Sequence, residues 1–150
     1  MLDVKGISKL ERLFRLAAHL DVDKTDLQRC TDFVNQKLYD LLLRGEAAAT
    51  ANGRDVIQPH DLPITKGLQE CIHAWKRLDA EIDLQPTFDD LATRPPLDLA
   101  CSDETDAELP RIIGGVSVAL ARAFTIIEPD LKNPQTRHWE QAMGVFNLLL

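Results

Sequence analysis

Aromatic and basic residues are both scarce in this sequence. Phe, Trp and Tyr make up 5% of its 150 residues, whereas Ala and Leu are common, which favours helices over sheets. Its 17 Lys and Arg residues are outnumbered by 24 Asp and Glu residues, so the formal net charge is −7. An acidic balance of this kind opposes binding to a phosphate backbone, although it is compatible with a local basic patch.

Disulfide, export and membrane signals are also missing. Cys30, Cys71 and Cys101 are odd in number and lie far apart, so we expect reduced thiols in a cytoplasmic protein. The first five residues have no features of a signal peptide, and no apolar run approaches the length of a membrane span. The sequence therefore predicts a cytoplasmic localisation and no membrane partner.

The motifs of enzyme chemistry are absent too. There is no glycine-rich phosphate loop, nucleophile elbow or zinc-ligand pattern. Cys71 and His73 fall on different faces of one predicted helix, and His60 beside Asp61 fits a helix start better than a catalytic pair. The acidic run 103–108 fits a solvated surface better than a divalent-ion site. We expect no enzyme activity, no cofactor and no metal.

The stretch from Thr25 to Leu62 organises the rest of the chain. Apolar residues recur every three or four positions from Leu27 to Ala48, which predicts one long helix buried along most of its length. Asp23 or Thr25 can cap its start, and Thr25 with Gln28 matches a capping box. Asn52–Gly53 predicts its end, and a short extended segment follows.

Two similar sets of elements are predicted around this helix. In the first half, a short helix at Ile7–Leu20 precedes it and a third helix at Pro59–Leu78 follows it. The second half repeats the order, with a short helix near Phe88, a loop at Leu97–Asp106, a long helix at about Ala107–Glu128, and a final helix starting at Asn133–Pro134.

The two halves also match in register. A shift of 75 residues, with no gap, gives ten matches, including Val34 with Leu109, Asp55 with Asp130, and Pro59 with Pro134. We interpret these matches as an internal duplication. Gly114 and Gly115 lie in the middle of the second long helix, where glycine is costly. We predict that they let the two long helices approach closely; the alternative is a local kink.

Short helix, long helix, strand and helix is the order of the histone fold, and the segment from Ala48 to Leu62 carries that resemblance. Arg54 and Asp61 have the spacing of the arginine–aspartate pair of histones, which implies an ion pair that pins the strand segment to the third helix. The phrases AAHLDVDKTDLQR, DLPITKGLQE and PPLDL extend the resemblance to a bacterial family of single-chain, paired histone-fold proteins.

This resemblance implies an all-α protein with a histone fold. The chain would form a single domain over residues 1–150, with two tandem histone-fold motifs at about 5–79 and about 85–150 packed as an intramolecular pseudo-dimer. Because the second copy lies in the same chain, we expect a folded monomer.

Several residues depart from the DNA-binding histones. At the position of Val56, the DNA-binding histones share a threonine that contacts phosphate. At the matching place in the second half, Pro129 and Thr136 replace the arginine and the aspartate, so no equivalent clamp is expected there. Residues 1–75 have 10 basic and 11 acidic side chains, whereas residues 76–150 have 7 and 13.

Two hypotheses for the function follow. The first is a non-enzymatic scaffold or interaction module with an unidentified protein partner. The alternative is a nucleoid-associated DNA-binding protein that contacts phosphates with one basic patch of its first half, formed by Lys5, Lys9, Arg12, Lys24 and Arg54. The net acidity disfavours DNA. An exposed apolar patch would favour the first hypothesis, and an exposed basic patch the second.

Overall fold

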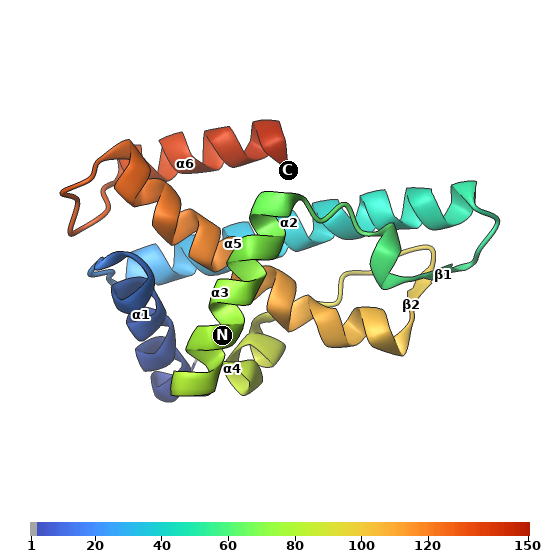
Figure 1. Ribbon diagram of the computed structural model, residues 1–150, viewed down its shortest axis with the longest axis horizontal. Coiled ribbons are helices and arrows are strands. Elements are labelled where there is room, and N and C mark those ends of the chain that lie inside the picture. The colour runs from blue at the N-terminus through green and yellow to red at the C-terminus, as the bar shows by residue number, and fades with distance from the viewer. Residues whose placement is uncertain (1–2) are drawn as a thin grey trace.

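A computed structural model describes residues 3–150 as a mainly helical fold, so the predicted all-α class is confirmed (Figure 1). Met1 and Leu2 lie outside the described residues. In chain order the elements are α1 (Val4–Ala18), α2 (Lys24–Ala51), β1 (Val56–Ile57), the 3₁₀ turn η1 (Pro59–Asp61), α3 (Lys66–Ile82), α4 (Gln85–Leu91), β2 (Ala100–Cys101), α5 (Asp103–Ile127) and α6 (Thr136–Leu149).

Helix α5 is the centre of the fold. It packs against α1, α2, α3, α4 and α6, and all residues from Ile112 to Val118 are buried. It is also long and apolar enough to cross a membrane, and most of its apolar part is buried inside the fold. The prediction that no run approaches this length was wrong. Burial on every side accounts for the composition, because a helix covered all round needs no polar face.

The two glycines in α5 allow a close helix contact, but not the predicted one. A Cβ on Gly114 would lie 2.5 Å from ring atoms of Trp75, and one on Gly115 would lie 2.5 Å from the side chain of Ile72. Both neighbours belong to α3, which crosses α5 in Figure 1. The glycines therefore bring α3 onto α5, whereas we expected them to bring the two long helices together.

The ends of α2 are defined by local hydrogen bonds. Asp23 caps the helix and accepts from the backbone N–H of Asp26, whose own carboxylate accepts from the backbone N–H of Asp23. The capping box therefore uses Asp23 and Asp26 in place of the predicted Thr25 and Gln28. The end at Asn52 and Gly53 is confirmed, and Gly53 has a φ of +72° that a side chain would strain.

The third helix begins later than predicted. Residues from Pro59 form only the single turn η1, and α3 starts at Lys66 with Thr65 as its cap. Pro63 explains the interruption, because the residue before a proline is disfavoured in the α region. Accordingly, Leu62 is extended, with a ψ of 131°. The predicted helix from Pro59 was wrong at this point.

The second half also differs from its predicted outline. The acids expected in a loop at 103–106 instead form the first turn of α5, which Ser102 caps and where negative charge is stabilised by the helix dipole. The strand β2 lies before the long helix, whereas β1 lies after it. The last helix starts at Thr136, two residues beyond the predicted Pro134, with Gln135 as its cap residue.

Each end of the molecule joins a connector of one half to a connector of the other. At one end β1 and β2 pair in parallel, with Val56 opposite Ala100 and Ile57 opposite Cys101. At the other end the backbone N–H of Asp21 donates to the carbonyl of Lys132 at 2.8 Å. The shift of 75 relates Ile57 to Lys132. It is not uniform, however, because the first connector spans residues 19–23 in one half and 92–102 in the other.

Candidate functional site

Polar networks lie at both connector ends, and the sequence singled out the one that contains Arg54 and Asp61. We call residues 52–61 with 97–106 the Arg54 end, and residues 19–26 with 128–139 the His138 end. The 28-residue helix α2 starts at one and finishes at the other. At about 1.5 Å per residue, it separates them by roughly 40 Å.

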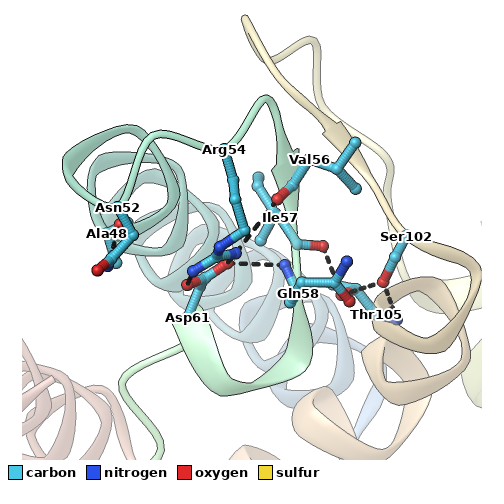
Figure 2. A network of polar contacts seen from close by, with 9 residues as sticks. All are labelled: Ala48, Asn52, Arg54, Val56, Ile57, Gln58, Asp61, Ser102 and Thr105. Carbon is cyan, nitrogen blue, oxygen red and sulfur yellow. Dashed lines mark hydrogen bonds and ion pairs between the residues drawn. The ribbon is translucent and has the colours of Figure 1, made fainter.

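At the Arg54 end, an ion pair fixes the turn after β1 (Figure 2). The guanidinium of Arg54 donates to both carboxylate oxygens of Asp61, each at 2.5 Å, and the backbone N–H of Gln58 donates to the same carboxylate at 2.8 Å. The Asp61 side chain is 2% exposed and that of Arg54 is 30% exposed. The hydrogen bonds from Arg54 lower the pKa of Asp61 to about 2, so the carboxylate is ionised at neutral pH.

The same end is tied to α5 through the backbone of β1. The carbonyl of Ile57 accepts from the backbone N–H of Ser102 at 3.0 Å and from the hydroxyl of Thr105 at 2.7 Å. Thr105 is completely buried. Sequence reasoning missed this residue because a threonine in the first turn of a helix gives no pattern of its own. Its hydroxyl adds a side-chain link between the two halves to the backbone links at this end.

At the His138 end, a histidine takes the place that Asp61 occupies at the other. The backbone N–H of Gln135 donates to Nδ1 of His138 at 2.9 Å, just as Gln58 donates to Asp61. Nε2 of His138 lies 3.4 Å from Oε1 of Glu128, which follows α5. His138 is 1% exposed, and its hydrogen bond lowers the pKa of Glu128. No arginine–aspartate clamp forms at Pro129 and Thr136, as expected, but Glu128 and His138 make a different contact in a comparable place, which the sequence did not predict.

Pro129 and Thr136, which the shift of 75 aligns with Arg54 and Asp61, make no contact with each other of this kind. Pro129 is exposed, and the hydroxyl of Thr136 accepts from the guanidinium of Arg29 at 3.1 Å. The pair Glu128–His138 was missed because an acid replaces the arginine, a histidine replaces the aspartate, and the spacing is longer by three residues. The capping pattern Gln135-x-x-His138, which parallels Gln58-x-x-Asp61, is the signal that would have found it.

A second contact at the His138 end joins α6 to α2. The indole Nε1 of Trp139 donates to Oδ1 of Asp26 at 2.7 Å, and both side chains are buried. Burial raises the pKa of the Asp26 carboxyl, because the charged form loses water. Phe33 of α2 and Phe146 of α6 continue the contact, with ring centroids 5.8 Å apart.

The five candidate phosphate contacts do not form one surface. Arg54 is engaged with Asp61, and Lys9 donates to the carbonyl of Asp83 at 2.6 Å. Lys5, Arg12 and Lys24 are at least partly exposed. Arg54 and Lys24 are at opposite ends of α2.

The surroundings of Arg54 are acidic. Four acidic residues are exposed at the same end: Asp55, Asp98, Asp103 and Glu104. Their charges would repel a phosphate that approached the guanidinium.

Apolar residues are exposed along the outer face of α6. Val145 is 49% exposed, Leu148 85% and Leu149 72%. Trp139 at the start of the same helix is fully buried, so α6 has a buried apolar side as well. The second apolar row was missed because a run of leucines gives no indication of which side faces the solvent.

Ligand-binding features are few in residues 3–150. No group of three His, Cys, Asp or Glu side chains has metal-binding geometry there. An open pocket of about 300 Å³ lies between the beginnings of α1 and α4, and its lining includes lysines as well as aspartates. A smaller one of about 160 Å³ lies beside β2 and contains Cys101, a thiol whose pKa is raised by burial. A thiol that ionises less readily is a poorer nucleophile.

These observations define an all-helical protein whose polar networks join its connectors. Comparison with known proteins places the chain in a family. Residues 10–147 match a domain of unknown function, DUF1931, and the chain belongs to that family.

Relatives are found in two bacteria. A crystal structure from Thermus thermophilus is similar, with 51% identity, a TM-score of 0.86, and coverage of 96% of this chain and 97% of that one. A crystal structure from Aquifex aeolicus has the same fold, with 24% identity, a TM-score of 0.84, and coverage of 100% and 99%. An uncharacterised Aquifex aeolicus (strain VF5) protein is 31% identical over 118 residues, which cover 77% of this chain and 68% of that protein.

Proposed function

We propose that the chain carries two histone-fold motifs packed as an intramolecular pseudo-dimer. The order of the helices in each half, a short one, a long one and a third one, supports this proposal, as does the joining of the two halves at both connector ends. The pair Arg54–Asp61 supports it further, because it is the ion pair that the histone resemblance implies. On this proposal the protein is a folded monomer. Sedimentation equilibrium over a dilution series tests this state. An obligate dimer that unfolds on dilution would contradict the proposal.

We propose that this protein is a non-enzymatic interaction module, and that the outer face of α6 is its binding surface for a protein partner. The observation that carries the proposal is the exposure of Val145, Leu148 and Leu149 on neighbouring turns of one helix. Apolar side chains gathered on one surface favour association, because a partner removes them from water. Exposed positions on α3, by contrast, include the polar residues Gln69, His73 and Lys76.

Site-specific photo-crosslinking in cells tests this function. A photoreactive residue at Leu148 is expected to capture a discrete protein, whereas one at Gln69, an exposed position on α3, is the matched control. Leu149→Lys should abolish the capture at position 148 while leaving the melting temperature unchanged, because Leu149 is 72% exposed. No crosslink at position 148, or equal crosslinking at both positions, would contradict the proposal.

DNA binding is the second candidate function. The observation that favours it is that Lys5, Arg12 and Lys24 are all at least partly exposed. Fluorescence anisotropy with double-stranded DNA at low and physiological salt tests it. Micromolar binding that weakens steeply with salt, and that is lost when the three residues are changed to Glu, would make this function the leading one. No binding at low salt would exclude it.

A further inference from the structure

We propose that His138 is a pH-sensitive latch for the first turn of α6: the neutral ring holds that turn to the end of α5, and protonation releases it. The inference does not depend on the partner proposed above, since it concerns hydrogen bonds within the chain. It rests on three facts: the position of His138 at the helix start, its burial, and the direction of its two ring contacts.

The ring contacts define which nitrogen carries the proton. Nδ1 accepts from the backbone N–H of Gln135 at 2.9 Å, so it must present a lone pair. In the neutral ring the proton is therefore on Nε2, which points at Oε1 of Glu128 at 3.4 Å. The neutral tautomer thus satisfies both nitrogens, one as acceptor and one as donor.

A second proton would remove the acceptor that holds the turn. Protonated Nδ1 and the N–H of Gln135 would be two donors facing each other, and the ring is 1% exposed, so water cannot take either role. The backbone carbonyl of Gln135 accepts from the N–H groups of His138 and Trp139, and its side-chain amide donates to the carbonyl of Asn133. His138 therefore supplies the side-chain acceptor for the Gln135 N–H. The chain can relieve the repulsion between these two donors by releasing the first turn of α6.

The charged groups around His138 do not reverse this outcome. Glu128 attracts a cation, but its side chain is 42% exposed, its contact is long, and Arg137 shares the same oxygen at 3.3 Å. From α2, Asp26 is engaged by the indole of Trp139, and Arg29 is engaged by Thr136. An exposed and shared carboxylate gives little compensation for a buried donor that has lost its acceptor.

The Arg54 end supplies an internal reference. Asp61 accepts from the backbone N–H of Gln58 in the same way, but its pKa of about 2 keeps it an acceptor throughout the range in which histidines change charge. Mild acid therefore leaves the Asp61 acceptor unchanged, whereas it would remove the His138 acceptor. Because α6 also carries the exposed residues Val145, Leu148 and Leu149, the latch would make the attachment of that face depend on pH.

Amide hydrogen exchange read by NMR tests the latch in the full chain, without any partner. After correction for intrinsic rates, protection of the Gln135 amide is expected to fall about fivefold to tenfold between about pH 7.5 and about pH 5.5. Protection of the Gln58 amide should stay unchanged over the same range, since Asp61 remains ionised. Equal protection of Gln135 at both pH values would overturn the proposal.

Two further measurements make the test independent of any single variant. In the wild type, the ring nitrogen shifts of His138 should report the tautomer with the proton on Nε2 near neutral pH; the other tautomer would overturn the latch. The double variant Glu128→Arg, His138→Asp copies the Arg54–Asp61 pair, and protection of Gln135 should then be independent of pH. A persistent pH response in a folded double variant would assign it to another group and overturn the proposal.

Discussion

At the Arg54 end an anion accepts the backbone N–H and a cation pairs with it, whereas at the His138 end a neutral ring accepts and an anion pairs with it. Both Asp61 and His138 are the third residue of their turn, and both are buried. What the position requires is therefore an acceptor, and the charge of that acceptor is free to change. The consequence is that the two ends respond to different ranges of pH.

The two tryptophans give a second comparison. Trp75 packs on Phe88 with ring centroids 5.4 Å apart, and Trp139 packs on Phe14 at 6.5 Å, so each half contributes one ring to each pair. The indole N–H of Trp139 donates to Asp26, whereas that of Trp75 is buried with no partner among the described residues. Helix α3 is thus held by close packing on Gly114, and α6 by a polar contact.

The largest expected effect tests the packing of α3. Gly114→Ala should lower the free energy of unfolding by about 2 kcal/mol in urea denaturation, because a Cβ there overlaps the Trp75 ring and overpacking costs more than the helix propensity gained. Gly144→Ala on α6 is the control, since nothing lies near its Cβ position, and it should stabilise by about 0.5–1 kcal/mol. If both variants were stabilised, α3 would not be held by close packing.

The next effect separates the two tryptophans. Trp139→Phe leaves an oxygen of buried Asp26 without its donor, whereas Trp75→Phe removes an N–H that has no partner in residues 3–150. Both changes remove the same volume, so Trp139→Phe should cost about 1–2 kcal/mol more in urea denaturation. Equal losses would show that the indole hydrogen bond contributes nothing to the attachment of α6.

The Arg54 end is expected to weaken measurably without its cation. Arg54→Ala should lower the melting temperature at neutral pH by about 3 °C, because Asp61 stays buried without its partner. The depressed pKa of Asp61 stabilises the fold above about pH 4, and that contribution disappears as the pH falls towards about 2. The difference between variant and wild type should therefore shrink over that range. An unchanged melting curve at pH 7 would contradict a stabilising role for the pair.

The sequence predicted the Arg54 end much better than the His138 end, and the reason is physical. An arginine and an aspartate seven residues apart around a turn form a recognisable pair of opposite charges, and the structure brings them together. Glu128 and His138 look unrelated in the sequence because one partner is neutral and the connector between them is longer. Their shared feature with the other end is a backbone hydrogen bond, which a search for matching charges does not detect.

Helix periodicity located the long helices but not their neighbours. The stripe on α2 is correct, since Val34 and Leu38 are buried, and the second long helix lies close to its predicted range, with residues such as Ile112 buried. Periodicity does not identify the partner of a given face, which is why Gly114 was expected to meet α2 when it meets α3. It also cannot separate a buried row from an exposed one on a helix as apolar as α6, where Leu148 faces outward.

The smallest expected effect has a pH dependence opposite to that of Arg54→Ala. Asp26 has a raised pKa in the folded state because burial penalises its charge, so its contribution to stability falls as the pH rises through that pKa. Asp26→Asn has no charge to bury and keeps one oxygen for the indole of Trp139, but it loses the second oxygen that accepts from the backbone N–H of Asp23, so the test compares the change with pH and not the stability at one pH. Between about pH 3 and about pH 6, the melting temperature of the variant should therefore rise by about 1–2 °C relative to that of the wild type. A shift in favour of the wild type would mean that the Asp26 carboxylate is stabilised at the His138 end, as Asp61 is at the other.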